Sequence, residues 1–94
     1  MNIKQCAVRS GGVIWTLPRP ARHDEVLRVV RESMSSESYA MKRCSTDENE
    51  RLIQGFITDG GEFVDRLAAG RIAKAAGQVR RLCWAPNLYS EDLW

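Results

Sequence analysis

A stretch rich in cations opens the first segment of this sequence that has helical periodicity. It reads PRPARHDEVLRVVRES at positions 18–33, and Arg19, Arg22 and His23 lie near its start. The N-terminal end of a helix carries about half a positive charge and therefore favours acidic side chains, not basic ones. Backbone N–H groups at such an end, with an arginine beside them, can bind a phosphate-like anion. We treat Arg22 and His23 as candidate ligand-binding residues. The alternative is that both point into water from the preceding loop and that Asp24 caps the helix.

A second group of candidates lies in the stretch QGFITDGGEFVDR, at positions 54–66. The two-residue period of strands places Phe56 and Thr58 on one face, and Phe63 and Asp65 on one face across the turn. One interpretation is an aromatic wall with polar side chains beside it, made by Phe56, Thr58, Phe63, Asp65 and Arg66. The alternative is that both phenylalanines belong to the core, as is common in a small sheet.

The sequence offers little support for catalysis or for metal binding. A nucleophile–histidine–acid group would have to use His23, the sole histidine, and no GxSxG motif accompanies it. The cysteines Cys6, Cys44 and Cys83 are widely spaced and form no CxxC pair, so a zinc site is not expected. We expect reduced, structural thiols, no cofactor, and a protein that is not an enzyme.

The elements that would position these residues can be read along the chain. The β-branched and aromatic run at 12–17 predicts a strand, and the apolar spacing within 21–34 predicts a helix. Residues 35–50 have no sustained period and are rich in serine and charge, so we expect a mobile connection there. Strands are expected at 52–58 and 62–65, because the intervening Asp-Gly-Gly favours a hairpin.

A second helix should begin after Asp65, which can act as its N-cap, and end at Gly77. The tail contains a possible strand at 79–84, and Ser90 could start a last helical turn. This order of elements predicts an α+β fold with a small, mostly antiparallel sheet and two helices packed on one face.

Composition limits the remaining possibilities. The 94 residues predict a single domain over 1–94, and 44% hydrophobic with 28% charged residues is ordinary for a globular protein. No apolar run approaches the about 18 residues of a membrane span, so we expect a cytoplasmic protein with no membrane partner. A net charge of +2 suits a small anionic ligand and gives little indication of duplex binding.

Two stretches resemble a family of small bacteriophage proteins. ARHDEVLRVV is similar to an RHxxVIR-type element, and QGFITDGGEFVDRLAAGRIAKAAGQV with the terminal LYSEDLW is similar to QGFxTxxGxFVxRxxAxxIAxxAGQ … LxSEDLW. The similarity covers roughly residues 19–32 and 54–94. We associate it with the phage Thoeris anti-defence proteins that act as sponges. These bind immune signals of the cyclic ADP-ribose type without cleaving them, and some also hold cyclic oligonucleotides.

The resemblance implies an α+β protein that forms a homodimer or an assembly of dimers in the infected host, with nucleotide pockets near subunit boundaries. It also implies that the ligand-contacting residues are Arg22, His23, Phe56, Thr58, Phe63, Asp65 and Arg66. The chain departs from the pattern at Glu62, where the turn more often ends in arginine, which weakens a phosphate-binding role for the turn.

Other classes of function stay open at this point. One is a phage inhibitor that contacts a host defence complex through an exposed hydrophobic and acidic tail. Another is a nucleic-acid-binding accessory protein that uses the arginines along one helix, Arg19, Arg22, Arg28 and Arg31; we do not expect a nucleic-acid partner. A purely structural role for every motif is also possible.

Overall fold

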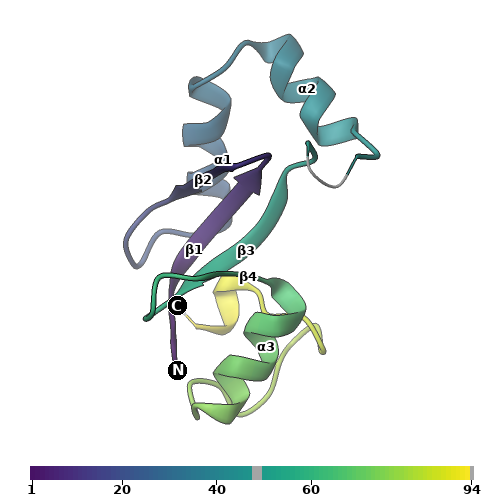
Figure 1. The fold of residues 1–94 in the computed structure, drawn as a ribbon. Coiled ribbons are helices and arrows are strands. Elements are labelled where there is room, and N and C mark those ends of the chain that lie inside the picture. The colour runs from purple at the N-terminus through teal and green to yellow at the C-terminus, as the bar shows by residue number, and fades with distance from the viewer. Residues whose placement is uncertain (48–49, 94) are drawn as a thin grey trace.

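A computed structural model describes residues 1–47 and 50–93. Its strands are β1 (Ile3–Ser10), β2 (Val13–Thr16), β3 (Ile53–Thr58) and β4 (Phe63–Asp65). Its helices are α1 (His23–Glu32), α2 (Ser36–Cys44), α3 (Arg66–Ala75) and a short 3₁₀ turn, η1 (Ser90–Asp92). The strands form one antiparallel sheet in the order β2-β1-β3-β4 (Figure 1). The predicted α+β class with an antiparallel sheet is confirmed.

The hairpin of β3 and β4 forms where the sequence predicts it. Gly61 occupies the turn with φ of 87°, a conformation that favours glycine, and its N–H donates to the Thr58 carbonyl at 2.9 Å. Strands predicted at 52–58 and 62–65 are observed at 53–58 and 63–65. The predicted strand at 12–17 and the helix at 21–34 are likewise confirmed as β2 and α1.

Residues 3–10 carry no clear strand pattern in the sequence, yet β1 is a central strand of the sheet. Its apolar residues do not alternate cleanly, because the register shifts between Ile3 and Gln5. Such an irregularity moves side chains from one face to the other and so removes the two-residue period. Beyond it, Cys6 and Val8 are fully buried on one face.

Both α1 and α3 pack on that same face of the sheet. Val26 and Val30 of α1 and Ala69 and Ala73 of α3 belong to one buried cluster. The other members of this cluster are Ile3, Cys6, Val8, Phe56, Leu82 and Leu88. The prediction of two helices on one face therefore describes α1 and α3.

The prediction of a mobile connection at 35–50 is wrong for residues 36–44, because they form the helix α2. Ser35 is its N-cap and accepts a hydrogen bond from the Ser38 N–H at 3.1 Å, while Lys42 and Arg43 lie in its last turn, where cations are favourable. Lys42 also donates to the Ser10 hydroxyl at 3.1 Å, which ties α2 to β1. In Figure 1, α2 lies at the end of the sheet opposite α3. Positions 48–49 of the predicted connection lie outside the described residues.

The strand predicted at 79–84 is wrong. Leu82 contributes its side chain to the core, but this segment pairs only through an isolated bridge between Trp84 and Asn87. A turn closed by the Asn87 N–H and the Trp84 carbonyl at 3.1 Å replaces the strand. Within the described residues, no helix is long and apolar enough to cross a membrane.

Candidate functional site

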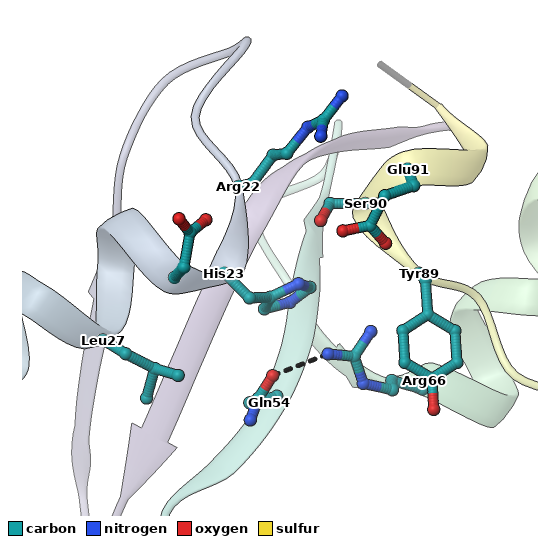
Figure 2. A pocket seen from close by; sticks show the side chains of 9 residues that line it. Arg22, His23, Leu27, Gln54, Arg66, Tyr89, Ser90 and Glu91 are labelled. Carbon is teal, nitrogen blue, oxygen red and sulfur yellow. Dashed lines mark hydrogen bonds between the residues drawn. The ribbon is translucent and has the colours of Figure 1, made fainter.

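A cleft of about 350 Å³ opens where four segments meet: the start of α1, strand β3, the start of α3 and the C-terminal turn η1 (Figure 2). We call it the first cleft. Its lining residues are Arg22, His23, Asp24, Leu27, Gln54, Arg66, Tyr89, Ser90 and Glu91.

Arg22 lies at the rim of the first cleft and is the N-cap of α1. Its backbone is extended, with φ of −105° and ψ of 172°, and its N–H donates to Glu25 Oε1 at 3.3 Å. The Arg22 side chain is exposed, and Figure 2 shows it above the opening. The structure therefore places a guanidinium group beside the N-terminal end of a helix, as the sequence predicts.

His23 forms part of the floor and is only 5% exposed. Its Nε2 lies 2.6 Å from the Gly55 carbonyl oxygen, so this nitrogen carries the proton and donates. Burial lowers the pKa of His23 from 6.5 to about 4, against the opposing effect of the Gly55 hydrogen bond. The imidazole is consequently neutral at pH 7, and its Nδ1 has no partner within the described part of the chain.

Arg66 joins three segments of the site. Its Nη1 donates to the Leu88 carbonyl at 2.9 Å and its Nη2 donates to Gln54 Oε1 at 2.6 Å (Figure 2). The guanidinium carbon also lies 4.1 Å from the centre of the Tyr89 ring, which is cation–π geometry. Burial lowers the pKa of Arg66 below its usual range. Arg66 thus fixes the C-terminal segment and supplies positive charge to the first cleft.

The C-terminal segment contributes Tyr89, Ser90 and Glu91, which sequence reasoning did not include among the site residues. Ser90 is 2% exposed and starts the predicted last helical turn, which is confirmed as η1. Its hydroxyl hydrogen-bonds the buried Cys6 thiol, whose pKa is raised to about 12 by burial. The terminal LYSEDLW motif is the sequence feature that could have identified these residues as part of the site. Its last residue, Trp94, lies outside the described residues.

Three of the seven predicted site residues meet in the first cleft: Arg22, His23 and Arg66. The other four have structural environments elsewhere. Thr58 is fully buried and its hydroxyl accepts from the Glu62 N–H at 3.3 Å, so it stabilises the hairpin turn. Asp65 caps α3, since its carboxylate accepts from the Ala68 N–H at 2.8 Å.

The predicted aromatic wall of Phe56 and Phe63 does not form. Phe56 pairs with Val64 and Phe63 with Ile57, so the two rings occupy opposite faces of the sheet. Phe56 is fully buried and meets the edge of His23, with ring centres 4.8 Å apart.

Phe63 lies on the opposite face, against Gly55. A Cβ at Gly55 would come 2.6 Å from the Phe63 ring, so only glycine allows this contact. The guanidinium carbon of Arg9 lies 4.9 Å from the centre of the same ring. Phe63 is therefore partly covered by its own sheet and does not reach the first cleft.

The charges of the first cleft are balanced in sign. Arg22 and Arg66 are positive, Asp24 and Glu91 are negative, and His23 is neutral. Such a lining can bind a ligand that combines anionic groups with hydroxyl donors, because guanidinium groups donate to phosphate oxygens and carboxylates accept from hydroxyl groups. Within the described residues, no group of three or more metal-ligating side chains is found.

The fold and the site together define a small α+β protein with one mixed-charge cleft built from separate segments. The family model described as Phage T4 y16D protein matches residues 2–94, and the chain belongs to this family of phage proteins. No curated protein and no solved structure matches the chain.

Proposed function

We propose that this phage protein binds and sequesters a nucleotide immune signal of the cyclic ADP-ribose type in the first cleft and does not cleave it. The observation that carries the proposal is the meeting of Arg22 and Arg66 with Tyr89 and Glu91 around one opening. Arginines suit the diphosphate, and an aromatic ring suits the adenine. The membership in a phage family agrees with a role during infection.

Two carboxylates of the first cleft are complementary to the ribose of the proposed nucleotide. Asp24 and Glu91 line the same opening, and both are exposed, so they are available to accept hydrogen bonds from ribose hydroxyl groups. A cleft for inorganic phosphate alone would gain nothing from these carboxylates, because they would repel it. The mixed lining therefore favours a sugar-containing nucleotide.

The chemistry of the floor supports binding without cleavage. The Cys6 thiol is buried and its pKa is raised to about 12, so a thiolate nucleophile is strongly disfavoured. His23 has its Nε2 proton engaged by Gly55, and its pKa of about 4 is far from the neutral range that suits an acid–base catalyst.

We further propose that the ligand is bound by a homodimer or an assembly of dimers. A volume of about 350 Å³ is at the low end for a pocket that encloses a small molecule. A second copy placed over the opening would bury more of the ligand. Multi-angle light scattering across a range of concentrations tests this part, and a monomeric mass in the presence of saturating ligand would contradict it.

Calorimetric titration with a panel of nucleotides tests the proposed function. The panel contains cyclic ADP-ribose isomers, cyclic di- and trinucleotides, and linear ADP-ribose, and the recovered ligand is examined by chromatography. We expect nanomolar binding of a cyclic ADP-ribose isomer and its recovery intact. Absence of binding across the panel, or release of a cleaved product, would overturn the proposal.

The competing inhibitor function has less structural support. It requires an exposed hydrophobic and acidic tail. The acidic Glu91 is exposed, but Leu88 is fully buried and Tyr89 and Leu93 are half-buried. The described part of the tail is instead packed on the body and lines the first cleft.

A further inference from the structure

We propose that a second region, between α1 and α2, binds single-stranded nucleic acid through its phosphate groups, with a base placed against Tyr39. Two adjoining hollows of about 290 Å³ each share Leu27 and Tyr39. We call them together the arginine cleft. The four arginines that line it are Arg28 and Arg31 of α1, Arg43 of α2, and Arg51 before β3.

The charge of the arginine cleft is high relative to that of the whole chain. Its described lining contains four arginines and one carboxylate, Asp24, whereas the chain carries a net charge of only +2. All four arginines are exposed. Cations gathered in a concave surface repel one another and attract a polyanion. The net charge of +2 is a sum over the whole chain and therefore does not reveal this local group of arginines. For that reason the composition alone gave little indication of nucleic-acid binding.

The arginines lie on two sides of one aromatic ring. Arg28 and Arg31 line one hollow, Arg43 and Arg51 line the other, and Tyr39 borders both. The guanidinium carbon of Arg43 lies 5.9 Å from the centre of the Tyr39 ring. This layout provides cations, then an aromatic surface, then cations again along the cleft.

A single strand fits this layout better than a duplex does. Proteins that bind single strands combine a positive groove with aromatic rings on which bases stack. In a duplex the bases stack on one another, so no base face is available to Tyr39. Because α1 and α2 contribute separate walls, at least two phosphates can be contacted at once. The site is distinct from the ligand contacts of Arg22 and Arg66, although both clefts border Leu27, Asp24 and Gln54.

Fluorescence anisotropy of a labelled 12-nucleotide oligothymidylate tests the proposal with the full chain. We expect micromolar binding at low salt, weaker binding of the corresponding duplex, and a salt slope of about −3 if all four arginines contact phosphate. An RNA strand of equal length is measured beside the DNA strand, and the tighter of the two identifies the sugar preference.

Charge reversal locates the site. The double variant Arg31→Glu/Arg43→Glu should weaken binding by tenfold or more. The matched double variant Arg71→Glu/Arg80→Glu removes the same charge at exposed positions outside both clefts and should weaken binding less than threefold. Thermal melting checks that each variant is folded, and Arg31→Gln/Arg43→Gln replaces the reversal if it is not.

The aromatic contact is tested separately. Tyr39→Leu should lose about tenfold in affinity, Tyr39→Phe should retain it, and an abasic strand should bind both variants equally. The proposal is overturned if the two charge-reversed variants lose affinity equally, if duplex binds as tightly as the single strand, or if no strand binds. None of these results depends on whether the first cleft binds a cyclic nucleotide.

Discussion

At the residue scale, His23 shows how one buried side chain can form the floor of a cleft without adding a charge to it. The sequence placed this histidine at a cationic helix start. The structure places its ring under the first cleft, hydrogen-bonded to Gly55 and edge-on to Phe56. Its neutrality matters, because burial makes a third positive charge beneath Arg22 and Arg66 unfavourable in spite of the nearby Glu91 and Asp24.

The stability of the fold should depend on pH through His23. Its pKa is lowered from 6.5 in the unfolded chain to about 4 in the native state, so only the unfolded state binds the proton between these values. Stability should therefore fall as the pH drops from 6.5 to 4, by about 3 kcal/mol from this residue. Urea unfolding at several pH values, for wild type and His23→Gln, measures this contribution. Parallel pH dependence in the two proteins would contradict the assignment.

The three cysteines should differ in reactivity. Cys6 is buried and its pKa is raised to about 12, whereas Cys44 and Cys83 are exposed. The pKa of Cys83 is also raised, first by its hydrogen bond with Asp92, which reduces its thiolate population. Thiol labelling of the native protein, followed by peptide mass analysis, should find Cys44 and Cys83 modified and Cys6 protected until denaturant is added. Rapid modification of Cys6 in the native protein would contradict the placement of the C-terminal turn over it.

At the element scale, α3 positions the site through its first residues and one glycine. Asp65 caps its start, Arg66 follows at once and reaches the first cleft, and Gly70 faces the C-terminal segment. A Cβ at Gly70 would lie 2.6 Å from the Pro86 carbonyl oxygen and 3.1 Å from Leu82. The absence of a side chain lets the segment that carries Tyr89 and Ser90 approach the helix.

Gly70→Ala should destabilise the protein by about 1–3 kcal/mol, although alanine favours helices, because the added methyl group meets backbone. Gly12→Ala is the matched control, since nothing lies within 4 Å of the added atom. Urea unfolding of both variants measures the difference. Equal stability of the two variants would show that the C-terminal segment does not pack closely on α3.

Asp65→Ala should lower stability by about 1 kcal/mol through loss of the helix cap while leaving ligand affinity unchanged. Asp65→Ser keeps a capping oxygen and should restore most of the stability. Calorimetric titration with cyclic ADP-ribose isomers, performed beside urea unfolding, separates the two effects. Loss of affinity in both variants would contradict this prediction and would indicate that Asp65 contacts the ligand.

Local signals predicted some elements well and others not at all. The Asp-Gly-Gly turn, the Asp65 cap and the valine stripe of α1 are contiguous in sequence, and each formed as predicted. Strand β1 was missed because its irregular register hides the alternation. The α2 helix was missed because it buries no residue in the core, so its cap at Ser35 was the main signal.

The candidate site was likewise predicted only where a local sequence signal marks its residues. Arg22 and His23 were found because a helix start has a charge preference that the sequence visibly violates. Phe56 and Phe63 were grouped because both are aromatic, but a one-residue difference in pairing sends them to opposite faces. Tyr89 and Glu91 reach the first cleft because tertiary contacts hold their segment, from Arg66 to Leu88 and Tyr89 and from Ser90 to Cys6, and no local spacing encodes these contacts.

At the scale of the whole molecule, the two clefts adjoin along α1, because both are lined by Asp24 and Leu27 of this helix. The α3 helix and the C-terminal segment line the first cleft, α2 lines the arginine cleft, and α2 and α3 lie at opposite ends of the sheet (Figure 1). A ligand that binds only the native state stabilises it by about 2.7 kcal/mol at one hundred times its dissociation constant. Occupation of the first cleft should therefore raise the stability of the whole fold, since α1, β3, α3 and the C-terminal segment all line it.

The most direct test of the central claim is calorimetric titration of cyclic ADP-ribose isomers into wild type, Arg22→Ala and the exposed control Arg71→Ala. If the first cleft is the binding site, wild type and Arg71→Ala should bind the same isomer with equal nanomolar affinity. Arg22→Ala should weaken that binding by tenfold or more, and the ligand should be recovered intact. Equal affinity in all three proteins would place the ligand elsewhere, and absence of heat in wild type would contradict nucleotide sequestration itself.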